Sequence, residues 1–427
     1  MTSEKTWFGH PRGLTVLFFT NMWEQFSYYG MRAILVYYMT KQLLLAQETS
    51  SVIYGIYTGC AYFTPLIGGF IADRFLGKKR AIIIGGSVMA LGHFMMTAEP
   101  LFYVALATIA IGNGLFLPSL PSQIRDLYQP GDPRAGRAYN VYYVGVNIGG
   151  FLAMLVCGAL GEAFGWHWGF GAAGVGMVTG LLFYLWGQRY LPAQTQLPRA
   201  ELLAAPRENM ARDTLLLLFS LGVAVAVFRS AYEQVGNTVA LWFDTGVYRL
   251  ADGFSIPFTW FFAINPLCVM LITPFLLAWW RKREAAGHTP LPTQRMATGA
   301  LIVGASYLFL AALSWTGDSG TVHWQWFALF WVVLTFGELF ILPTGIGLFA
   351  RLAPQRLGAT TVASWFLATF AGNLAAGLVG TFWSRMSPPA FFVLLAGICV
   401  LAATALRLLD ARAQHVTTIT RPQANPD

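Results

Sequence analysis

The sequence predicts an all-α membrane protein that crosses the bilayer many times. Hydrophobic residues make up 56% of its 427 residues and charged residues only 11%, against roughly 25% charged residues in a typical soluble protein. Mean hydropathy is +0.55. The 33 phenylalanines exclude a disordered chain. A soluble fold of this length could not cover so large an apolar core with so few charges.

Apolar segments of membrane length recur along the whole chain. A membrane-spanning helix needs about 20 mostly apolar residues, and twelve segments meet this need. They cover about residues 13–39, 52–74, 79–97, 101–123, 137–161, 168–190, 214–243, 254–281, 295–314, 324–350, 357–384 and 390–409. The first is too long for a signal-peptide core and no small-residue cleavage site follows it, so we expect a retained helix.

The longest connection between these segments, residues 191–213, contains Pro and Arg and separates six helices from six. We expect an N-terminal six-helix bundle over residues 1–190, a cytoplasmic linker over 191–213 and a C-terminal six-helix bundle over 214–427. An internal repeat of this kind is common in transporters, in which two halves alternately open a midplane cavity to either side.

The basic residues predict the orientation, because cytoplasmic segments of membrane proteins carry excess Lys and Arg. If the N-terminus is cytoplasmic, only three of the 27 Lys and Arg residues fall outside and two fall within helices. The net charge of +8 therefore reflects topology, and we do not expect a nucleic-acid partner. We expect a multi-pass protein of the cell (inner or plasma) membrane, in contact with the lipid bilayer, with both termini cytoplasmic.

Charged side chains inside the predicted spans are the main functional signal, because they are expensive in a membrane and usually face a water-filled cavity or a partner. They are Glu24, Arg32, Arg229, Glu233 and Glu338. They fall in the first, seventh and tenth spans, which all belong to the set formed by every third helix. A cavity lined by these three glutamates and two arginines would suit a small zwitterion, because an arginine can bind its carboxylate and a glutamate its amine.

Two of these spans carry polar residues at helical spacing. Asn21, Glu24, Tyr28 and Arg32 recur every three or four residues and share one helix face. Arg229 and Glu233 are four apart in the seventh span. An alternative interpretation is a buried ion pair that only fixes helix register. The tenth span, which carries Glu338, contributes no cation of its own.

Several motifs together resemble one transporter family. The end of the second span and the loop after it contain the motif Gly69-Phe-Ile-Ala-Asp73-Arg74-Phe-Leu-Gly77-Lys78-Lys79-Arg80. The first and fifth spans contain Glu24-Gln-Phe-Ser-Tyr-Tyr-Gly-Met-Arg32 and Tyr142-Tyr-Val-Gly-Val-Asn147-Ile-Gly-Gly150. Later spans contain Tyr232-Glu233-Gln234, Asn265-Pro266, Gly337-Glu-Leu-Phe340 and Trp365-Phe-Leu367. The chain resembles the proton-dependent oligopeptide transporter (POT) family of the major facilitator superfamily.

The resemblance implies the superfamily fold and a role for each matching residue. The peptide carboxylate is assigned to Arg32, with Tyr28, Tyr29 and Tyr62 nearby. The peptide backbone and amino terminus are assigned to Asn147, Asn265 and Glu338. A side-chain pocket is assigned to Trp365. The proton-coupling candidates are Glu24 and Glu233, and the conformational latch of the loop is Asp73, Arg74 and Lys78.

Four positions depart from the family pattern. The usual Glu-x-x-Glu-Arg of helix 1 reads Asn21-Met-Trp-Glu24-Gln25, and the usual Phe-Lys-Pro of helix 4 has Leu117 in place of the lysine. Arg229 stands where the family usually carries Trp. We hypothesise that Arg229 partly replaces the missing helix 4 lysine as the partner of Glu233, and we include it among the substrate-binding residues. The short 191–213 linker leaves no room for the helical hairpin of many bacterial members.

The predicted function is uptake of di- and tripeptides by alternating access, as symport with protons on the family pattern. One alternative is an uncoupled facilitator, or a transporter of another small zwitterionic or anionic solute, which the missing charges favour. A second is a non-transporting sensor or assembly partner. No metal-ligand or nucleophile–base spacing points to an enzyme, a metal site or a cofactor. A monomer is implied by the resemblance alone.

Overall fold

The computed structural model describes residues 7, 9–129, 132, 134–192, 212–251, 253–288, 290–316, 322–352 and 358–419. The predicted linker lies outside the described residues except at its two ends. Several basic residues used for the orientation also lie outside them, namely Lys5, Arg199, Arg207, Arg356 and Arg421.

Each predicted span corresponds to a helix or to consecutive helices. In the first half these are α1 (Arg12–Tyr37), η1 (Tyr38–Gln42), α2 (Gln47–Ile71), η2 (Ala72–Leu76), α3 (Lys78–Met95), η3 (Glu99–Leu101), α4 (Phe102–Asp126), α5 (Arg134–Phe164), α6 (Trp166–Gly187) and η4 (Gln188–Tyr190). The elements η1 and η2 are single π-helical turns that extend α1 and α2, and η3 and η4 are 3₁₀ turns.

The second half follows the same pattern with short extra elements. These are α8 (Arg212–Tyr232), η5 (Glu233–Gly236), α9 (Thr238–Gly246), β1 (Val247–Tyr248), β2 (Leu250–Ala251), β3 (Phe254–Ser255), α10 (Phe258–Phe262), α11 (Ile264–Ala285), α12 (Pro292–Thr316), β4 (Val322–His323), α13 (Trp324–Arg351), α14 (Gly358–Gly380), η6 (Trp383–Arg385), α15 (Pro388–Leu408) and α16 (Asp410–Ile419). Strand β1 pairs in parallel with β4, and β2 pairs antiparallel with β3.

Ten helical segments among the described residues are long and apolar enough, by length and composition, to cross a membrane. The predicted spans that fall short are α1, which carries Glu24 and Arg32, and α3, which begins with three basic residues. Helix α1 packs against α4, α5 and α6, so its polar residues are covered by protein rather than lipid. The architecture confirms the predicted all-α polytopic membrane fold.

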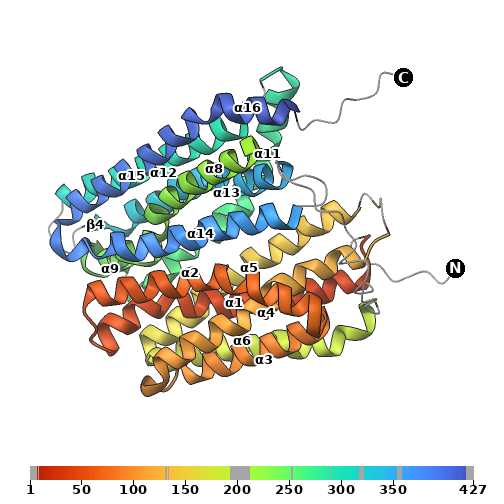
Figure 1. Ribbon diagram of the computed structural model, residues 1–427. Helices are drawn as coiled ribbons and strands as arrows, with labels where there is room; N and C mark the ends of the chain where they lie inside the picture. The colour runs from red at the N-terminus through yellow and green to blue at the C-terminus, as the bar shows by residue number, and fades with distance from the viewer. Residues whose placement is uncertain are drawn as a thin grey trace. The chain divides into compact units, whose positions relative to one another are not determined.

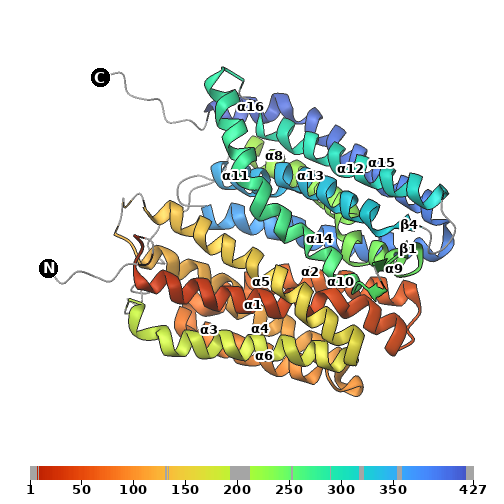
Figure 2. The same cartoon turned by 180° about the vertical axis from the view of Figure 1, so that it is seen from behind.

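The chain forms two compact units. Unit 1 comprises Met1–Leu45, Cys60–Pro198 and Arg249–Met270, and unit 2 comprises Ala46–Gly59, Arg199–Tyr248 and Leu271–Asp427. Within unit 1, helices α1, α3, α4, α5 and α6 run side by side (Figures 1 and 2). Within unit 2, helices α8, α12, α13, α14 and α15 do the same. The units are built from noncontiguous segments, and the six-plus-six division at residues 191–213 stays a prediction.

Glycine allows the closest helix approaches inside each unit. In unit 1, a side-chain carbon at Gly68 of α2 would collide with the backbone of Gly114 in α4. In unit 2, a side-chain carbon at Gly372 of α14 would lie 2.5 Å from the Cβ atom of Arg229 in α8. Small residues at such crossings let membrane helices gain van der Waals contact, which is the main attraction available to them in lipid.

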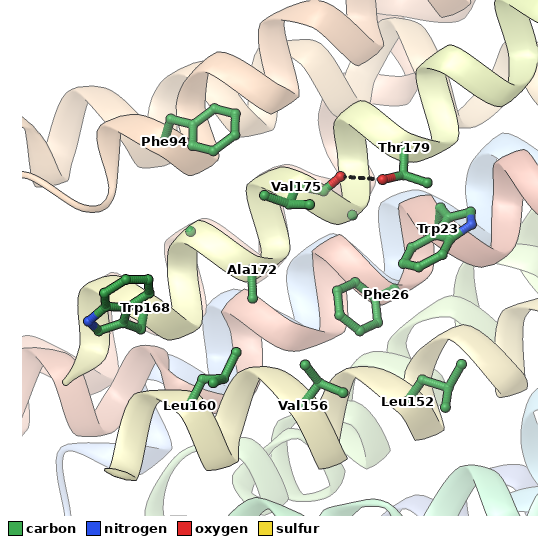
Figure 3. Close-up of a pocket in the computed structure, with 12 residues that line it drawn as sticks. Trp23, Phe26, Phe94, Leu152, Val156, Leu160, Trp168, Ala172, Val175 and Thr179 are labelled. Atoms are coloured by element: carbon green, nitrogen blue, oxygen red, sulfur yellow. Dashed lines mark hydrogen bonds between the residues drawn. The ribbon is translucent and has the colours of Figure 1, made fainter. Parts of the chain in front are cut away.

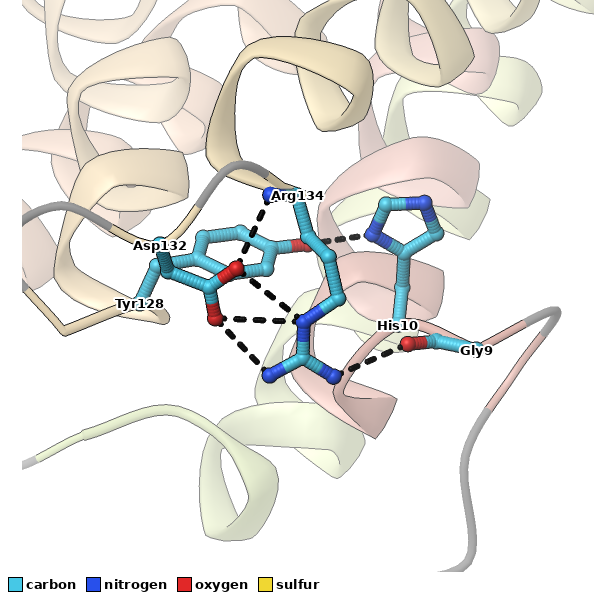
Figure 4. A network of polar contacts seen from close by, with 5 residues as sticks. All are labelled: Gly9, His10, Tyr128, Asp132 and Arg134. Atoms are coloured by element: carbon cyan, nitrogen blue, oxygen red, sulfur yellow. Dashed lines mark hydrogen bonds and ion pairs between the residues drawn. The ribbon is translucent and has the colours of Figure 1, made fainter.

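A polar network fixes the segment before α1 to the turn between α4 and α5 in unit 1 (Figure 4). The Nδ1 atom of His10 lies 2.7 Å from the hydroxyl oxygen of Tyr128. The Arg134 guanidinium pairs with Asp132 at 2.8 Å and donates to the carbonyl oxygen of Gly9 at 3.1 Å. The Asp132 carboxylate also accepts from the backbone N–H of Arg134 at 2.8 Å, which caps the first turn of α5.

Candidate functional site

The predicted polar stripe of α1 lies in unit 1 and is largely buried. Asn21 and Glu24 are each 1% exposed. The Nε2 atom of Gln25 donates a hydrogen bond to Oε2 of Glu24 at 2.6 Å, and Asn21 donates to the carbonyl oxygen of Tyr142 in α5 at 3.3 Å. Gln25 stands where the family pattern has an arginine. It therefore gives Glu24 a neutral amide donor next in sequence instead of a positive charge.

Apart from Glu338, the other residues that the sequence assigned to the carboxylate and backbone of the substrate also fall in unit 1. Tyr28 is buried, and its ring packs edge-to-face on Tyr29 with 5.3 Å between centroids. The amide of Asn147 in α5 donates to the carbonyl oxygen of Tyr143 one turn earlier, at 2.9 Å. Three more residues are half-buried, namely Arg32, Tyr62 and Asn265. Asn265 belongs to this unit although it follows the other members by more than a hundred residues.

Unit 2 holds the predicted pair at the end of α8. The Nη2 atom of Arg229 lies 2.5 Å from Oε1 of Glu233, and the two side chains are 5% and 1% exposed. The guanidinium also donates to Oδ1 of Asn373 in α14 at 3.4 Å. Sequence reasoning missed Asn373, although an amide inside the apolar helix α14 was a visible signal.

Tyr232 connects this pair to Glu338 of α13. The Arg229 guanidinium carbon lies 5.5 Å from the centroid of the Tyr232 ring. The Tyr232 hydroxyl lies within hydrogen-bonding reach of Glu338, which is 8% exposed. One arginine, one phenol and two carboxylates thus form a single buried cluster. In the sequence, Tyr232 stands out only as part of the motif Tyr232-Glu233-Gln234.

The helix carrying the cluster is broken directly after it. Helix α8 ends at Tyr232, the next turn is 3₁₀, and Asn237 has a φ of −118° and a ψ of −96°. The Gln234 amide holds the break by donating to the carbonyl oxygens of Ser230 at 3.1 Å and Ala376 at 2.7 Å. The Ser51 hydroxyl, in the first part of α2, donates to Oδ1 of Asn237 at 3.0 Å. Side chains therefore satisfy polar groups at a point where the regular helix is lost.

Trp365 of α14 also lies in unit 2 and is 6% exposed. Its ring packs edge-to-face on Phe349, with 5.4 Å between centroids. A side chain on Gly345 would collide with the Trp365 ring, so this glycine makes the space that the indole fills.

The basic loop after α2 is held to α4 in unit 1. The Nζ atom of Lys78 pairs with Oδ2 of Asp126 at 2.7 Å and also donates to the carbonyl oxygen of Ser122 at 3.3 Å. Arg74 lies over the ring of Phe70, 5.7 Å from its centroid. Gly77 has a φ of +76°, a left-handed conformation that favours glycine. Asp73, the third predicted latch residue, lies in the π-helical turn η2.

The described residues contain no group of three or more His, Cys, Asp and Glu side chains that could hold a metal ion. The polar clusters of the two units instead combine buried carboxylates, a buried guanidinium, amides and phenols. These groups bind charged and hydrogen-bonding solutes, and a proton can move on and off a carboxylate.

Membrane-length helices with buried charges in α1, α8 and α13 define a polytopic membrane transporter of the major facilitator type. A family model described as the POT family matches residues 79–200 and 194–394. The chain belongs to the POT family. Family members are transporters rather than enzymes.

Known relatives and a solved structure resemble the chain over most of its length. It is 30% identical over 452 residues to the "Peptide transporter YePEPT" of Yersinia enterocolitica subsp. palearctica serotype O:3 (strain YE-P4), with 88% of each chain covered. It is 30% identical to a "Di-/tripeptide transporter" of Lactococcus lactis subsp. cremoris, covering 86% of this chain and 88% of that protein. A crystal structure of a POT peptide transporter in complex with sulfate matches with a TM-score of 0.88 at 28% identity, covering 97% of both chains.

Proposed function

We propose that the protein takes up di- and tripeptides across the cell membrane by alternating access, in symport with protons. The observation that carries this proposal is the buried cluster of Arg229, Tyr232, Glu233 and Glu338 in a member of the POT family. The relatives named peptide transporters support the substrate class. The orientation with both termini cytoplasmic and a monomeric state are part of the proposal.

The two ends of the peptide are each recognised by a side chain of opposite charge. Arg32, with Tyr28, Tyr29 and Tyr62, binds the carboxylate. Glu338 binds the ammonium group, because an ionised acceptor forms the strongest hydrogen bonds to a cationic donor. Asn147 and Asn265 bind the peptide backbone, Arg229 completes the polar binding surface, and Trp365 lines a side-chain pocket. Recognition of the two termini leaves the peptide side chains only loosely selected.

Glu24 and Glu233 play different parts in proton coupling. The hydrogen bond that Glu24 accepts comes from the neutral amide of Gln25, so a proton on Glu24 does not remove the counter-charge of a buried cation. A proton on Glu233 removes the carboxylate charge that faces Arg229, which is costly in a buried ion pair. Glu24 is therefore the proton carrier, and Glu233 responds when substrate draws Arg229 away.

Asp73, Arg74 and Lys78 act as a conformational latch at the start of α3. The 2.7 Å ion pair between Lys78 and Asp126 holds this loop against α4. Rearrangement of the loop during transport requires this pair to open. The pair is partly exposed, with side-chain exposures of 27% and 38%, so opening costs about 1 kcal/mol or less.

An uncoupled facilitator is the second candidate, because Gln25 and Leu117 replace two cations of the family pattern. The substrate class is tested by uptake of labelled dialanine into proteoliposomes. We expect unlabelled di- and tripeptides of varied sequence to compete, whereas free alanine and N-acetylated dialanine do not. Equal competition by free alanine would assign the protein to another small zwitterion.

A further inference from the structure

A groove of about 560 Å³ runs along one side of unit 1 (Figure 3). Side chains of α5, including Val156 and Leu160, form one wall and the outward face of α6 forms the other. Phe26 of α1 lies between the two walls, directly beneath α6. The groove therefore lies between two membrane-spanning helices, and an aromatic ring forms its floor.

The lining offers hydrocarbon contact and almost no hydrogen bonding. The hydroxyl of Thr179 donates to the carbonyl oxygen of Val175 in its own helix, at 2.8 Å. The remaining polar side-chain atoms of the lining are the N–H groups of two tryptophan rings, Trp23 and Trp168. A peptide or another water-soluble ligand would lose its hydration here without replacement, whereas an alkyl chain would lose nothing.

The groove opens onto the outer surface of these helices. Val156 of α5 and Val175 of α6 are 40% and 58% exposed, and Trp168 is 57% exposed. An apolar surface on a membrane-spanning helix faces lipid hydrocarbon, and the groove is continuous with this surface.

The length of the groove matches one leaflet of the bilayer. It extends along α6 from Trp168, in the first turn of the helix, to Thr179. At 1.5 Å per residue this distance is roughly 16 Å, about half of the ~30 Å hydrocarbon core. Tryptophan is enriched where membrane helices meet the headgroup region. Trp168 thus marks the headgroup end and Thr179 the middle of the bilayer.

We propose that this groove binds one acyl chain of a membrane phospholipid, drawn from the leaflet in which α6 begins. The glycerol and headgroup lie beside Trp168, and the chain runs between α5 and α6 over Phe26. Phe26 directly follows Gln25 in sequence, so the bound chain supports the helix segment that carries Glu24 and its amide partner.

Gly171 provides a clean way to fill the groove. A side-chain carbon at Gly171 would have no heavy atom within 4 Å, and the same is true of Gly397 on α15, which does not line the groove. The variant Gly171→Phe therefore places a ring in the groove without a collision at its base. Gly397→Phe adds the same ring to another membrane-spanning helix and is the matched control. Gly171→Leu is a second, smaller filling variant.

The test is native mass spectrometry of the delipidated full chain, titrated with dipalmitoyl phosphatidylglycerol. We expect the wild type and Gly397→Phe to bind a first lipid with the same Kd, and Gly171→Phe and Gly171→Leu to bind it about ten-fold more weakly or worse. The didecanoyl lipid, which is too short to fill the groove, should bind the wild type more weakly. Equal unfolding midpoints for the variants establish that each one is folded.

Equal lipid binding by wild type, Gly171→Phe and Gly171→Leu would overturn the proposal. Equal binding of the long and short lipids would also overturn it, because the length of the groove would then play no part. If Gly171→Phe instead removed a dimer of the chain and left lipid binding unchanged, the groove would be a contact between two copies, which also contradicts the proposal.

Discussion

Arg229 and Glu233, one helical turn apart at the end of α8, form an ion pair with 2.5 Å between Nη2 and Oε1, and both are almost completely buried. Two features of the sequence make this ion pair unusual for the POT family. Leu117 removes the lysine expected in helix 4, and Arg229 adds a cation next to the remaining carboxylate. The structure thus places a cation one turn before Glu233 in the same predicted span, and the hypothesis that Arg229 takes over the role of the lysine is open to test.

The Arg229–Glu233 pair predicts strong energetic coupling between the two residues. Arg229→Gln or Glu233→Gln alone leaves a buried charge facing a neutral group, and each should lower the free energy of unfolding by about 3–5 kcal/mol. The double variant should lose less than the sum of the two. Chemical or thermal unfolding of the four proteins measures the coupling. Strictly additive losses would show that the two charges do not interact.

The same pair predicts a requirement for positive charge in transport. Arg229→Trp, which restores the usual family residue, should lower dialanine uptake and change its dependence on pH, because Glu233 loses its partner. Arg229→Lys keeps a charge and should retain more activity. Uptake into proteoliposomes over a range of external pH is the measurement. An unchanged rate and pH profile in Arg229→Trp would remove the proposed role of this arginine.

Glu338 is predicted to recognise the amino terminus of the peptide. Replacing the carboxylate by an amide in Glu338→Gln removes a charge-assisted hydrogen bond, which contributes about 1.5–3 kcal/mol, or about ten- to a hundred-fold in Kd. Dialanine binding should weaken by this amount. N-acetylated dialanine lacks the ammonium group, so its weak binding should change little. Dialanine binding as tight as in the wild type would contradict the assignment.

His10 is predicted to make unit 1 less stable at acid pH. Burial lowers the pKa of His10 from its usual value, and the positive charges of Arg137 and Arg134 lower it further, opposed by Asp132. Because the unfolded chain keeps the usual pKa of about 6.5, it takes up a proton before the folded chain does as the pH falls. The contribution of His10 to the free energy of unfolding is therefore constant above about pH 6.5 and declines below it.

The measurement for His10 is the unfolding midpoint between about pH 5 and pH 8, across the usual imidazole pKa. Wild type should lose stability on the acid side, and His10→Phe should lose less over the same range. Tyr128→Phe removes the hydroxyl that lies 2.7 Å from Nδ1 but keeps the ring and the imidazole. It should retain a dependence on pH. An identical acid-side slope in wild type and His10→Phe would show that His10 does not set it.

Local patterns in the sequence predicted the membrane fold and the charged faces of single helices. The polar stripe of α1 follows directly from three- and four-residue spacing, and the Arg229–Glu233 pair from spacing of four. Partners that are distant in sequence were not predicted. Asn373 joins Arg229 from α14, and Asp126 joins Lys78 from α4, because those contacts depend on which helices pack together.

Sequence hydropathy also failed to show where helices break. The seventh span reads as one apolar run, yet it divides at Glu233–Gly236 into α8 and α9. The break depends on Gln234, whose amide donates to the carbonyl oxygen of Ala376, 142 residues later. Hydropathy measures only the average polarity of a segment, and tertiary hydrogen bonds decide whether a regular helix is needed to satisfy its backbone.

The central claim, proton-coupled peptide uptake with Glu24 as the carrier, is tested most directly by dialanine accumulation in proteoliposomes under an imposed membrane potential, with and without an inward proton gradient. We predict that the gradient drives dialanine above its external concentration in the wild type. In Glu24→Gln, which keeps the size of the side chain, the gradient should have no effect, while exchange of dialanine across the membrane continues. If wild-type dialanine only equilibrates, or if Glu24→Gln accumulates it as well as the wild type, the claim is contradicted.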